Sequence, residues 1–204
     1  MNFDLQNFLA PKGEVVCGLD EAGRGPLAGP VYAGAVILPE GYLPEGLNDS
    51  KKLSEKRREA LFEEITSHAL AWGYGTASPE EIDAINILEA SLLAMRRAVA
   101  SLSQTPDLLL VDGNIQRGFH QKAIAVVKGD GRVPAIAAAS IIAKVLRDRA
   151  CLAMAKSYPQ YGFEKHKGYP TKAHYEAIDA YGICPLHRKS FLKNRGITDR
   201  KSVV

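Results

Sequence analysis

The chain has 204 residues, is 46% hydrophobic and carries a formal net charge of only +3, a composition that predicts one domain of good size with a real core. No run of about 18 apolar residues is present, which argues against a membrane span, and the N-terminus lacks the basic and apolar segments of a secretory signal. The chain has three widely spaced cysteines, Cys17, Cys151 and Cys184. Their odd number and spacing predict reduced thiols in a cytoplasmic protein and argue against a zinc site.

Charge is unevenly distributed along the chain. Residues 156–204 carry ten Lys or Arg against four Asp or Glu, whereas residues 1–155 carry 16 basic and 19 acidic side chains. A basic end beside an acidic body fits a polyanionic partner and bound metal ions, and a solvated basic face with no partner is the alternative. We expect one compact unit that consists of a core (1–155) and a helical, basic C-terminal extension (156–204).

The first part of the chain is predicted to form two strands, a helix and a third strand. Residues 14–20 and 31–38 are rich in Val and Ile, and the loop 23–30 joins them. Ser54 is the expected N-cap of a helix whose apolar face is formed by Leu61, Ile65 and Ala69. A strand at about 70–77 follows.

A long helix is predicted to begin after Ser78. A serine at the N-cap, Pro79 at the first helical position and Glu81 at the third form the signature of a capping box. The apolar stripe that we expect to face the core consists of Ile85, Leu88, Leu92, Met95 and Val99.

The rest of the chain adds two strands and a buried helix before the extension. Residues 107–111 and 123–127 are short apolar strands, and 133–155 is a helix that is apolar nearly all round. In the extension, a last helix begins at Pro170 and ends near Gly182. The order ββαβαββα predicts an α/β fold in which a mixed sheet is flanked by helices.

Four carboxylates stand where strands are predicted to end. Asp20 and Glu21 follow the first strand, Asp112 ends another, and Asp130 comes just after a third. Such ends gather in one crevice of a sheet with helical crossovers, and four carboxylates there require a cation. Oxygen ligands favour Mg²⁺ or Mn²⁺ over zinc, and two such ions support phosphoryl chemistry. Turns that face solvent are the alternative.

Six motifs follow one another over roughly residues 14–192. They are Gly18–Leu27, Leu47–Leu53, Val111–Asn114, Val127–Asp130, Ala137–Val145 and His166–Thr171. In this order they resemble the motifs of the bacterial ribonuclease HII family, the type 2 ribonucleases H.

The resemblance implies an RNase H-like fold and a hydrolase, an endonuclease that cuts the RNA strand of RNA–DNA hybrids. It also implies cleavage at a single ribonucleotide embedded in duplex DNA, a step of ribonucleotide excision repair, with 5′-phosphate and 3′-hydroxyl products. Two divalent ions, Mg²⁺ or Mn²⁺, are expected at the site. We expect a cytoplasmic monomer that has nucleic acid as its partner and no contact with a membrane.

The resemblance also assigns roles to individual residues. The catalytic and metal-binding acids map onto Asp20, Glu21, Asp112 and Asp130. A substrate-binding loop maps onto Gly23, Arg24 and Gly25, and the substrate-sensing tyrosine maps onto Tyr169. We expect the acid at position 20 to bridge the two ions.

The chemistry of the loop and the tyrosine fits the recognition of ribose. Gly23 and Gly25 let backbone groups reach a 2′-hydroxyl without obstruction. Tyr169 can stack on the neighbouring deoxyribose and bond the ribose hydroxyl; the alternative is a loop tyrosine that caps the core. Arg24 is expected to bind substrate, or instead to brace the loop against an acid.

Five further residues are candidates for substrate contact, namely Asn48, Ser50, Lys51, Lys52 and Lys144. The two lysines at the entrance of the first helix suit phosphates, and a solvated face is the alternative. Lys144 is expected to emerge from the buried helix near the site or to be a plain helix-end lysine. The histidines of the extension are expected at the surface or in contact with nucleic acid: His166, His174 and His187.

Two other classes of protein compete with this interpretation. The pattern Gly23–Ala28 formally matches a dinucleotide fingerprint, but that motif needs a helix where Pro26 and Pro30 lead into another strand. A non-enzymatic nucleic-acid binder would explain the basic extension. It would have no need of four acids, which repel phosphate unless metal ions are bound.

Overall fold

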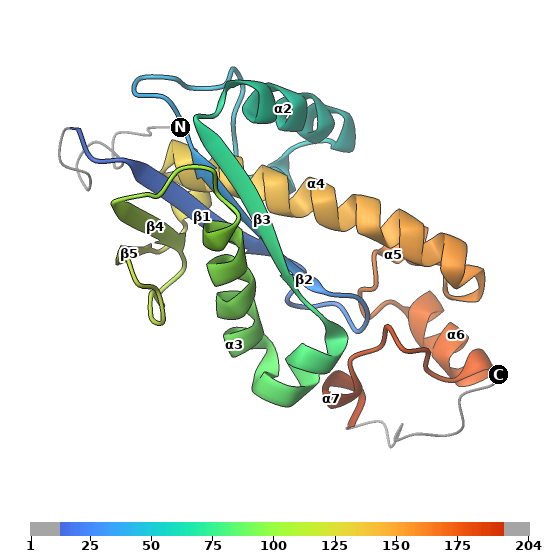
Figure 1. Ribbon diagram of the computed structural model, residues 1–204. Coiled ribbons are helices and arrows are strands. Elements are labelled where there is room, and N and C mark those ends of the chain that lie inside the picture. The colour runs from blue at the N-terminus through green and yellow to red at the C-terminus, as the bar shows by residue number, and fades with distance from the viewer. Residues whose placement is uncertain (1–12, 194–204) are drawn as a thin grey trace.

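A five-stranded mixed sheet forms the centre of the molecule, and the computed structural model describes residues 13–193 (Figure 1). The strands are β1 (Val16–Ala22), β2 (Val31–Ile37), β3 (Ala71–Ala77), β4 (Leu108–Asp112) and β5 (Lys122–Val126). Their order in the sheet is β3-β2-β1-β4-β5. β1, β2 and β3 are antiparallel neighbours, whereas β1, β4 and β5 run parallel. The predicted mixed sheet is confirmed.

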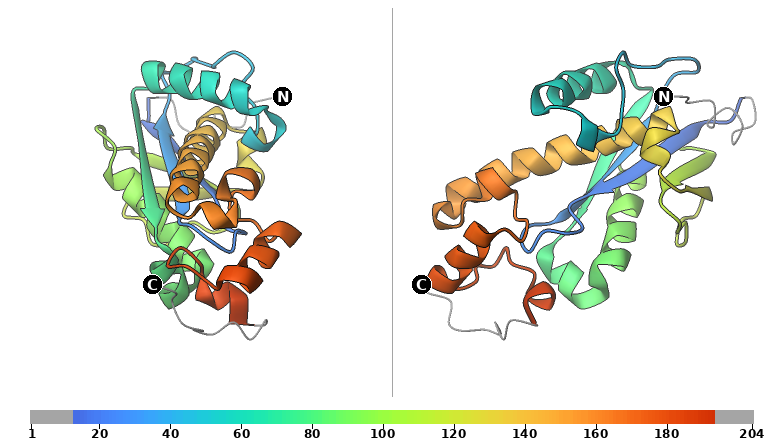
Figure 2. Two further views of the ribbon diagram at one scale, coloured as in Figure 1. Left: turned by 90° about the vertical axis from the view of Figure 1, so that its right-hand side faces the viewer. Right: turned by 180° about the vertical axis from the view of Figure 1, so that it is seen from behind.

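Helices cover both faces of this sheet. α3 (Pro79–Ala100) packs against β2 and β3, and α4 (Pro134–Ser157) crosses the opposite face over β1 and β2, with α2 (Glu55–His68) beside it (Figures 1 and 2). The shorter helical segments are η1 (Ser50–Lys52), η2 (Gly129–Gly131), η3 (Pro159–Tyr161), α5 (Phe163–His166), α6 (Lys172–Tyr181) and α7 (Lys189–Leu192). The predicted order of elements and the helical C-terminal region are confirmed. No helix between residues 13 and 193 has the length and apolar character needed to cross a membrane.

The predicted helix caps are present. Ser54 accepts a hydrogen bond from the first turn of α2 through its side chain. The Ser78 backbone N–H donates to Glu81 Oε2 at 2.9 Å and the Glu81 N–H donates to Ser78 Oγ at 3.3 Å, which completes the capping box of α3. Thr171 caps α6, and Gly182 ends it. Local sequence therefore determines where these helices begin and end.

The predicted apolar stripe of α3 is wrong at its start, because the helix is kinked. Asn86 has φ 67° and ψ 166°, outside the helical region. Its side chain accepts hydrogen bonds from the next turn and acts as a second N-cap. The kink resets the rotation of the helix, so Ile85 is 38% exposed whereas Ile82 and Leu92 are buried.

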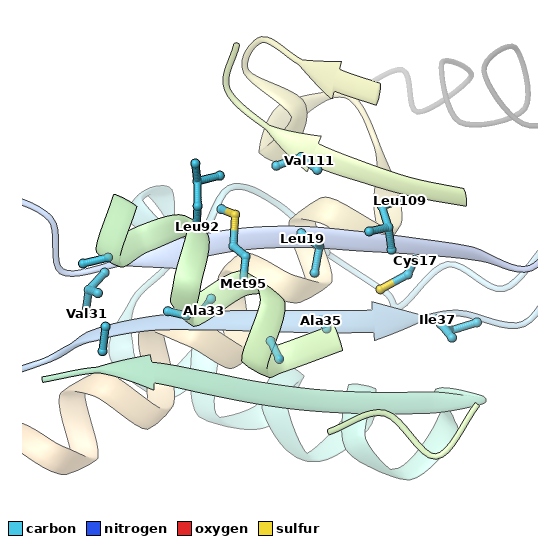
Figure 3. Close-up of a cluster of buried hydrophobic side chains, with 14 of the residues drawn as sticks. Cys17, Leu19, Val31, Ala33, Ala35, Ile37, Leu92, Met95, Leu109 and Val111 are labelled. Atoms are coloured by element: carbon cyan, nitrogen blue, oxygen red, sulfur yellow. The ribbon is translucent and has the colours of Figure 1, made fainter. Parts of the chain in front are cut away.

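Each face of the sheet buries its own apolar cluster. Between the sheet and α3, Leu92 and Met95 of the helix belong to one cluster with Cys17 and Leu19 of β1, and Leu19 lies beside Met95 (Figure 3). On the opposite face, α4 packs against α2 and β2, with Leu61, Phe62, Ile65, Ile141 and Ile142 in the cluster. Because both faces are covered, polar side chains of the central strands can reach solvent only at the strand ends.

Two glycines allow α4 to lie very close to the sheet. A Cβ added to Gly18 of β1 would stand 2.1 Å from the backbone of Ala135, and one added to Gly34 of β2 would stand 2.3 Å from the Ala139 carbonyl oxygen. The facing helix positions are themselves alanines, so backbone meets backbone. This contact fixes the helix over the strand that carries Asp20.

We predict that Gly18→Ala destabilises the protein by about 2 kcal/mol or more, because the methyl group would have to displace backbone rather than a flexible side chain. Chemical denaturation followed by circular dichroism measures the effect. Gly25→Ala is the control for stability, since its nearest neighbour would lie 3.5 Å away. Equal stability of Gly18→Ala and the wild type would contradict the close approach of α4.

Candidate active site

The carboxyl ends of two parallel strands bring Asp20 and Asp112 together. In the parallel pair of β1 and β4, Leu19 lies beside Val111. The next residues along the two strands, Asp20 and Asp112, are therefore also neighbours. Adjacent strands lie about 4.8 Å apart, and equal register sends both side chains to the same face of the sheet. Asp20 is buried, with 5% of its surface exposed.

β1 continues two residues beyond its predicted end at Asp20. It does so because Asp20, Glu21 and Ala22 all pair with β2. Alternation along the strand turns Glu21 away from the face that Asp20 occupies, yet the Asp112 charge still raises the pKa of the Glu21 carboxyl. Glu21 therefore reaches the same sheet edge from the other side of the strand.

Asp112 holds the loop that carries the fourth acid. Its Oδ1 accepts a hydrogen bond from the Gly129 backbone N–H at 2.7 Å and a longer one from the Asp130 N–H at 3.4 Å. A side chain at position 129 would approach Ile136 Cδ1 to 2.5 Å, so glycine is needed there. The link between β4 and η2 brings Asp130 to the site.

Burial raises the pKa of three of the acids, Asp20, Glu21 and Asp130, and repulsion by neighbouring carboxylates raises it further. Burial raises the pKa of Asp20 well above its usual value, and the charges of Glu21, Asp112 and Asp130 raise it further. Burial likewise raises the pKa of Glu21 and that of Asp130, and the Asp112 charge contributes to both shifts. The four acids predicted from the sequence therefore form one electrostatically coupled group at one sheet edge.

The turn before α2 places a basic side chain against the acids. Lys51 Nζ lies 4.0 Å from Asp130 Oδ2. Burial lowers the pKa of Lys51, but the charges of Asp20, Asp130 and Asp49 outweigh this effect and leave the pKa raised. Asp49, which the sequence interpretation did not select, accepts a hydrogen bond from the Lys51 backbone N–H at 2.9 Å. Its position within the motif Leu47–Leu53 is the signal that could have identified it.

The loop after β1 lies against Tyr169. Gly23 has a φ of 97°, and a Cβ there would meet Arg147 Nε at 2.1 Å, so this position requires glycine. A Cβ on Gly25 would lie 3.5 Å from the Tyr169 ring. Tyr169 itself is 43% exposed. The loop and the tyrosine, 144 positions apart in the numbering of the chain, form one surface.

Arg24 contacts an acid in the structure. Its Nη1 lies 3.4 Å from Glu21 Oε1 on the exposed side of the loop. This pair is the brace that the sequence left open as an alternative to substrate binding. The loop then enters β2 without forming a helix, so the interpretation of Gly23–Ala28 as a dinucleotide fingerprint is wrong.

Two buried arginines beneath this loop were missed by the sequence interpretation. The Arg147 guanidinium donates from Nη2 to the Lys167 carbonyl oxygen at 2.8 Å and lies 5.6 Å from the centre of the Tyr169 ring. Arg188 is fully buried and bonds the Gly23 carbonyl oxygen at 2.7 Å. A charged residue inside an apolar helix was the available signal for Arg147. Nothing in the sequence separates Arg188 from the other basic residues of the extension.

The remaining residues that were predicted to contact substrate differ in burial and in their hydrogen-bond partners. Asn48 Oδ1 accepts a hydrogen bond within its own turn at 2.8 Å, Ser50 is buried, and Lys52 is exposed. Lys144 Nζ donates to Asp148 Oδ1 at 2.7 Å along α4. The structure therefore shows Lys144 in an ion pair on its own helix.

Two histidines of the extension are buried, so their predicted surface location is wrong. His174 and His187 are 0% and 2% exposed, and their Nε2 atoms lie 3.1 Å apart. Burial lowers the pKa of His187 to about 4, which keeps it neutral near pH 7. The half-buried His166 stacks on His174 with ring centres 4.4 Å apart. The packing of α5 and α6 around Phe163 encloses these rings.

The donor set of the four acids fits a hard divalent cation. Every donor is a carboxylate oxygen, the ligand type that Mg²⁺ and Mn²⁺ prefer. Within residues 13–193, no group of three or more His, Cys, Asp or Glu side chains is already arranged to hold one metal ion. The four carboxylates lie at one sheet edge but are not arranged around a single metal position, as expected for like charges that repel each other.

Comparison with known proteins agrees with this geometry. Residues 17–194 match the family model described as Ribonuclease HII. A protein of Vibrio campbellii with the name Ribonuclease HII is 57% identical over 189 residues, which are 92% of this chain and 89% of that protein.

Two solved structures share the fold. The ribonuclease H2 of Pyrococcus horikoshii superposes with a TM-score of 0.74 at 30% identity, over 89% of this chain and 96% of the other. Bst-RNase HIII in complex with Mn²⁺ superposes with a TM-score of 0.65 at 16% identity, over 89% of this chain and 68% of the other. The second likeness concerns the fold alone.

We predict that Asp20→Asn has a higher free energy of unfolding than the wild type in EDTA at pH 7. Burial and three neighbouring acids raise the pKa of Asp20, so ionised Asp20 destabilises the metal-free folded state. Because the folded state holds this proton more tightly, the penalty grows as pH rises above the unfolded value.

Thermal unfolding in EDTA and in Mg²⁺ measures both parts of this prediction. Mg²⁺ should stabilise the wild type more than Asp20→Asn, because ligand binding to the folded state raises stability. Asp179→Asn, which changes an exposed aspartate of α6, is the control. A destabilised Asp20→Asn in EDTA, or equal Mg²⁺ responses, would contradict the grouping of the acids.

Proposed function

Because the chain belongs to the ribonuclease HII family and is thus an endoribonuclease H that acts on RNA–DNA hybrids, we propose that it also cleaves at single ribonucleotides in duplex DNA. We propose that it uses two divalent ions and leaves 5′-phosphate and 3′-hydroxyl ends. The observation that carries the proposal is the coupled group of four acids beside an exposed glycine loop and tyrosine.

Asp20, Glu21, Asp112 and Asp130 would hold the ions. Asp20 is central, since the charges of all three other acids act on it, and it would bridge the two cations. Bound ions supply a nucleophilic water and neutralise charge on the scissile phosphate. Rotation of the side chains about their χ angles would close the ligand set while the strand positions stay fixed.

The network around the acids would preorganise this closure. Asp112 Oδ1 is held by the Gly129 N–H, which leaves its second oxygen for a ligand bond. Asp20 Oδ1 accepts the Glu21 N–H at 2.7 Å and is restrained in the same way. Restrained carboxylates lose less freedom when they bind, so the site would bind ions at a smaller entropic cost.

Recognition of ribose would belong to the loop and the tyrosine. Gly25 has no side chain, and even an added Cβ would only be in van der Waals contact with the Tyr169 ring. A deoxyribose that stacks on this ring would place the 2′-hydroxyl of the neighbouring ribose beside the loop backbone. A hydroxyl at that position both donates and accepts hydrogen bonds, which distinguishes RNA from DNA. The loop directly follows the strand that carries Asp20 and Glu21, so the sensed ribose would lie next to the cleaved phosphate.

Basic side chains near the acids would contact the substrate backbone. Lys51 has a highly exposed side chain beside Asp130, and it is suited to a phosphate that approaches the ions. Arg24 would exchange its ion pair with Glu21 for a phosphate when substrate binds. The Glu21 side chain is only 14% exposed, so bound cations would have to replace Arg24 as the counter-charge of Glu21.

A cleavage assay tests the proposal. A duplex that carries one ribonucleotide should be cut on the 5′ side of that ribonucleotide only when Mg²⁺ or Mn²⁺ is present. Asp20→Asn should abolish this cleavage and retain hybrid binding in a gel-shift assay, whereas Asp179→Asn should cut normally. Full turnover by Asp20→Asn would refute the metal role, and binding without cleavage by the wild type would favour a non-enzymatic binder.

A second prediction concerns Tyr169. We expect Tyr169→Ala to reduce cleavage of the single-ribonucleotide duplex by about tenfold or more, because it removes both the ring face that packs on the sugar and a hydrogen bond worth about 0.5–1.5 kcal/mol, and about 1.4 kcal/mol corresponds to a factor of ten in rate. Tyr169→Phe keeps the ring and removes the hydroxyl, so it separates stacking from hydrogen bonding. Tyr181→Ala removes another exposed tyrosine of the extension as a control. Unchanged preference for the ribonucleotide in Tyr169→Ala would exclude its sensing role.

A further inference from the structure

Arg188 donates hydrogen bonds from all three nitrogens of its guanidinium to the backbone of the loop after β1. Nε donates to the Gly29 carbonyl oxygen at 2.9 Å, Nη1 to that of Arg24 at 3.0 Å and Nη2 to that of Gly23 at 2.7 Å. The side chain is fully buried. Both ends of the loop are therefore fastened to one side chain from the other end of the chain.

The charge of Arg188 has no carboxylate in direct contact among the described residues. No Asp or Glu oxygen within residues 13–193 comes within 4.0 Å of its guanidinium. A buried charge is retained only where it is compensated, and here three carbonyl dipoles of the loop provide that compensation together with the Phe191 ring, whose centre lies 5.2 Å from the guanidinium. Because the guanidinium donates all its hydrogen bonds to the loop, it is suited to hold that loop in one conformation.

These bonds fix the direction in which the loop amides point. The peptide bonds are trans, so the N–H of each peptide points opposite to its C=O. Since the carbonyls of Gly23 and Arg24 turn inward to Arg188, the N–H groups of Arg24 and Gly25 turn outward. Both residues are exposed, and the second lies beside the Tyr169 ring.

The same segment is tied to its surroundings by the backbone on both sides. The Arg188 N–H donates to the Leu27 carbonyl oxygen at 2.8 Å, and the Leu27 N–H donates to the Gly168 carbonyl oxygen at 2.8 Å, next to Tyr169. On the far side, Asp83 of α3 accepts hydrogen bonds from the Ser190 N–H at 2.9 Å and from the Lys189 N–H at 2.8 Å. The loop, the tyrosine and α7 form one connected unit.

We propose that Arg188 is a positioning residue: it turns the Arg24 and Gly25 amides toward the substrate as paired donors for an oxygen acceptor, a ribose hydroxyl or a phosphate. The inference rests on the proposed recognition of ribose by this loop. The paired donors face the surface that Tyr169 borders, so they act on the ribonucleotide next to the sugar that the tyrosine stacks against. Arg188 itself contacts no substrate.

Arg188→Lys tests this role because it keeps the charge and loses the fork that spans three carbonyls. We expect KM for the single-ribonucleotide duplex to rise about tenfold, and the preference for that duplex over a uniform RNA–DNA hybrid to fall. Arg97→Lys is the matched control: Arg97 also bonds a backbone carbonyl and a carboxylate, but on α3 and β3. Its KM and preference should equal those of the wild type.

A second variant covers the case in which Arg188→Lys does not fold. Asp83 hydrogen-bonds α7 and makes no hydrogen bond to the guanidinium or the loop, although its negative charge acts on Arg188. Asp83→Ala would therefore release α7 and should raise KM in the same direction by a smaller factor. A merely structural role would lower the fraction of active enzyme equally on both substrates and leave KM and preference unchanged, and that result would overturn the inference. If the wild type itself showed no cleavage at single ribonucleotides, the proposed function would fail instead.

Discussion

Repulsion between carboxylates at one buried sheet edge is the constraint on which the rest of the site depends. The parallel pairing of β1 with β4 makes Asp20 and Asp112 neighbours, and the hydrogen bond from Gly129 to Asp112 adds Asp130. Their mutual charge and their burial raise the pKa of Asp20. The fold maintains this unfavourable group through the close contact of α4 with β1, which requires Gly18. Divalent cations are the partners that would relieve the repulsion.

The proposed selection of substrate would depend on segments that lie beside this edge but are distant in the sequence. The loop after β1 presents backbone groups, and the C-terminal region supplies both Tyr169 and Arg188, which pack around it. Arg147 adds a second buried cation between the loop and the tyrosine. Besides its basic charge, the extension therefore supplies two residues that contact the loop after β1, namely Tyr169 and Arg188.

The sequence allowed prediction of the parts that depend on local patterns. Apolar runs that end in acids located Asp20, Asp112 and Asp130, and the Ser78 capping box located the start of α3. The roles of these residues came from the family resemblance. Asn86 could not be predicted as a kink, because asparagine also occurs inside helices, and its positive φ here depends on packing as well as on the local hydrogen bonds of its side chain. The bonds of Arg188 depend on a contact across the whole chain.

Anomalous X-ray diffraction from crystals grown with Mn²⁺ and an uncleaved single-ribonucleotide duplex tests the central claim most directly. The account predicts two manganese peaks, both ligated by Asp20, with Glu21, Asp112 and Asp130 completing the ligand sets. Peaks at some other place in the molecule, or an Asp20 side chain directed away from the metals, would contradict it.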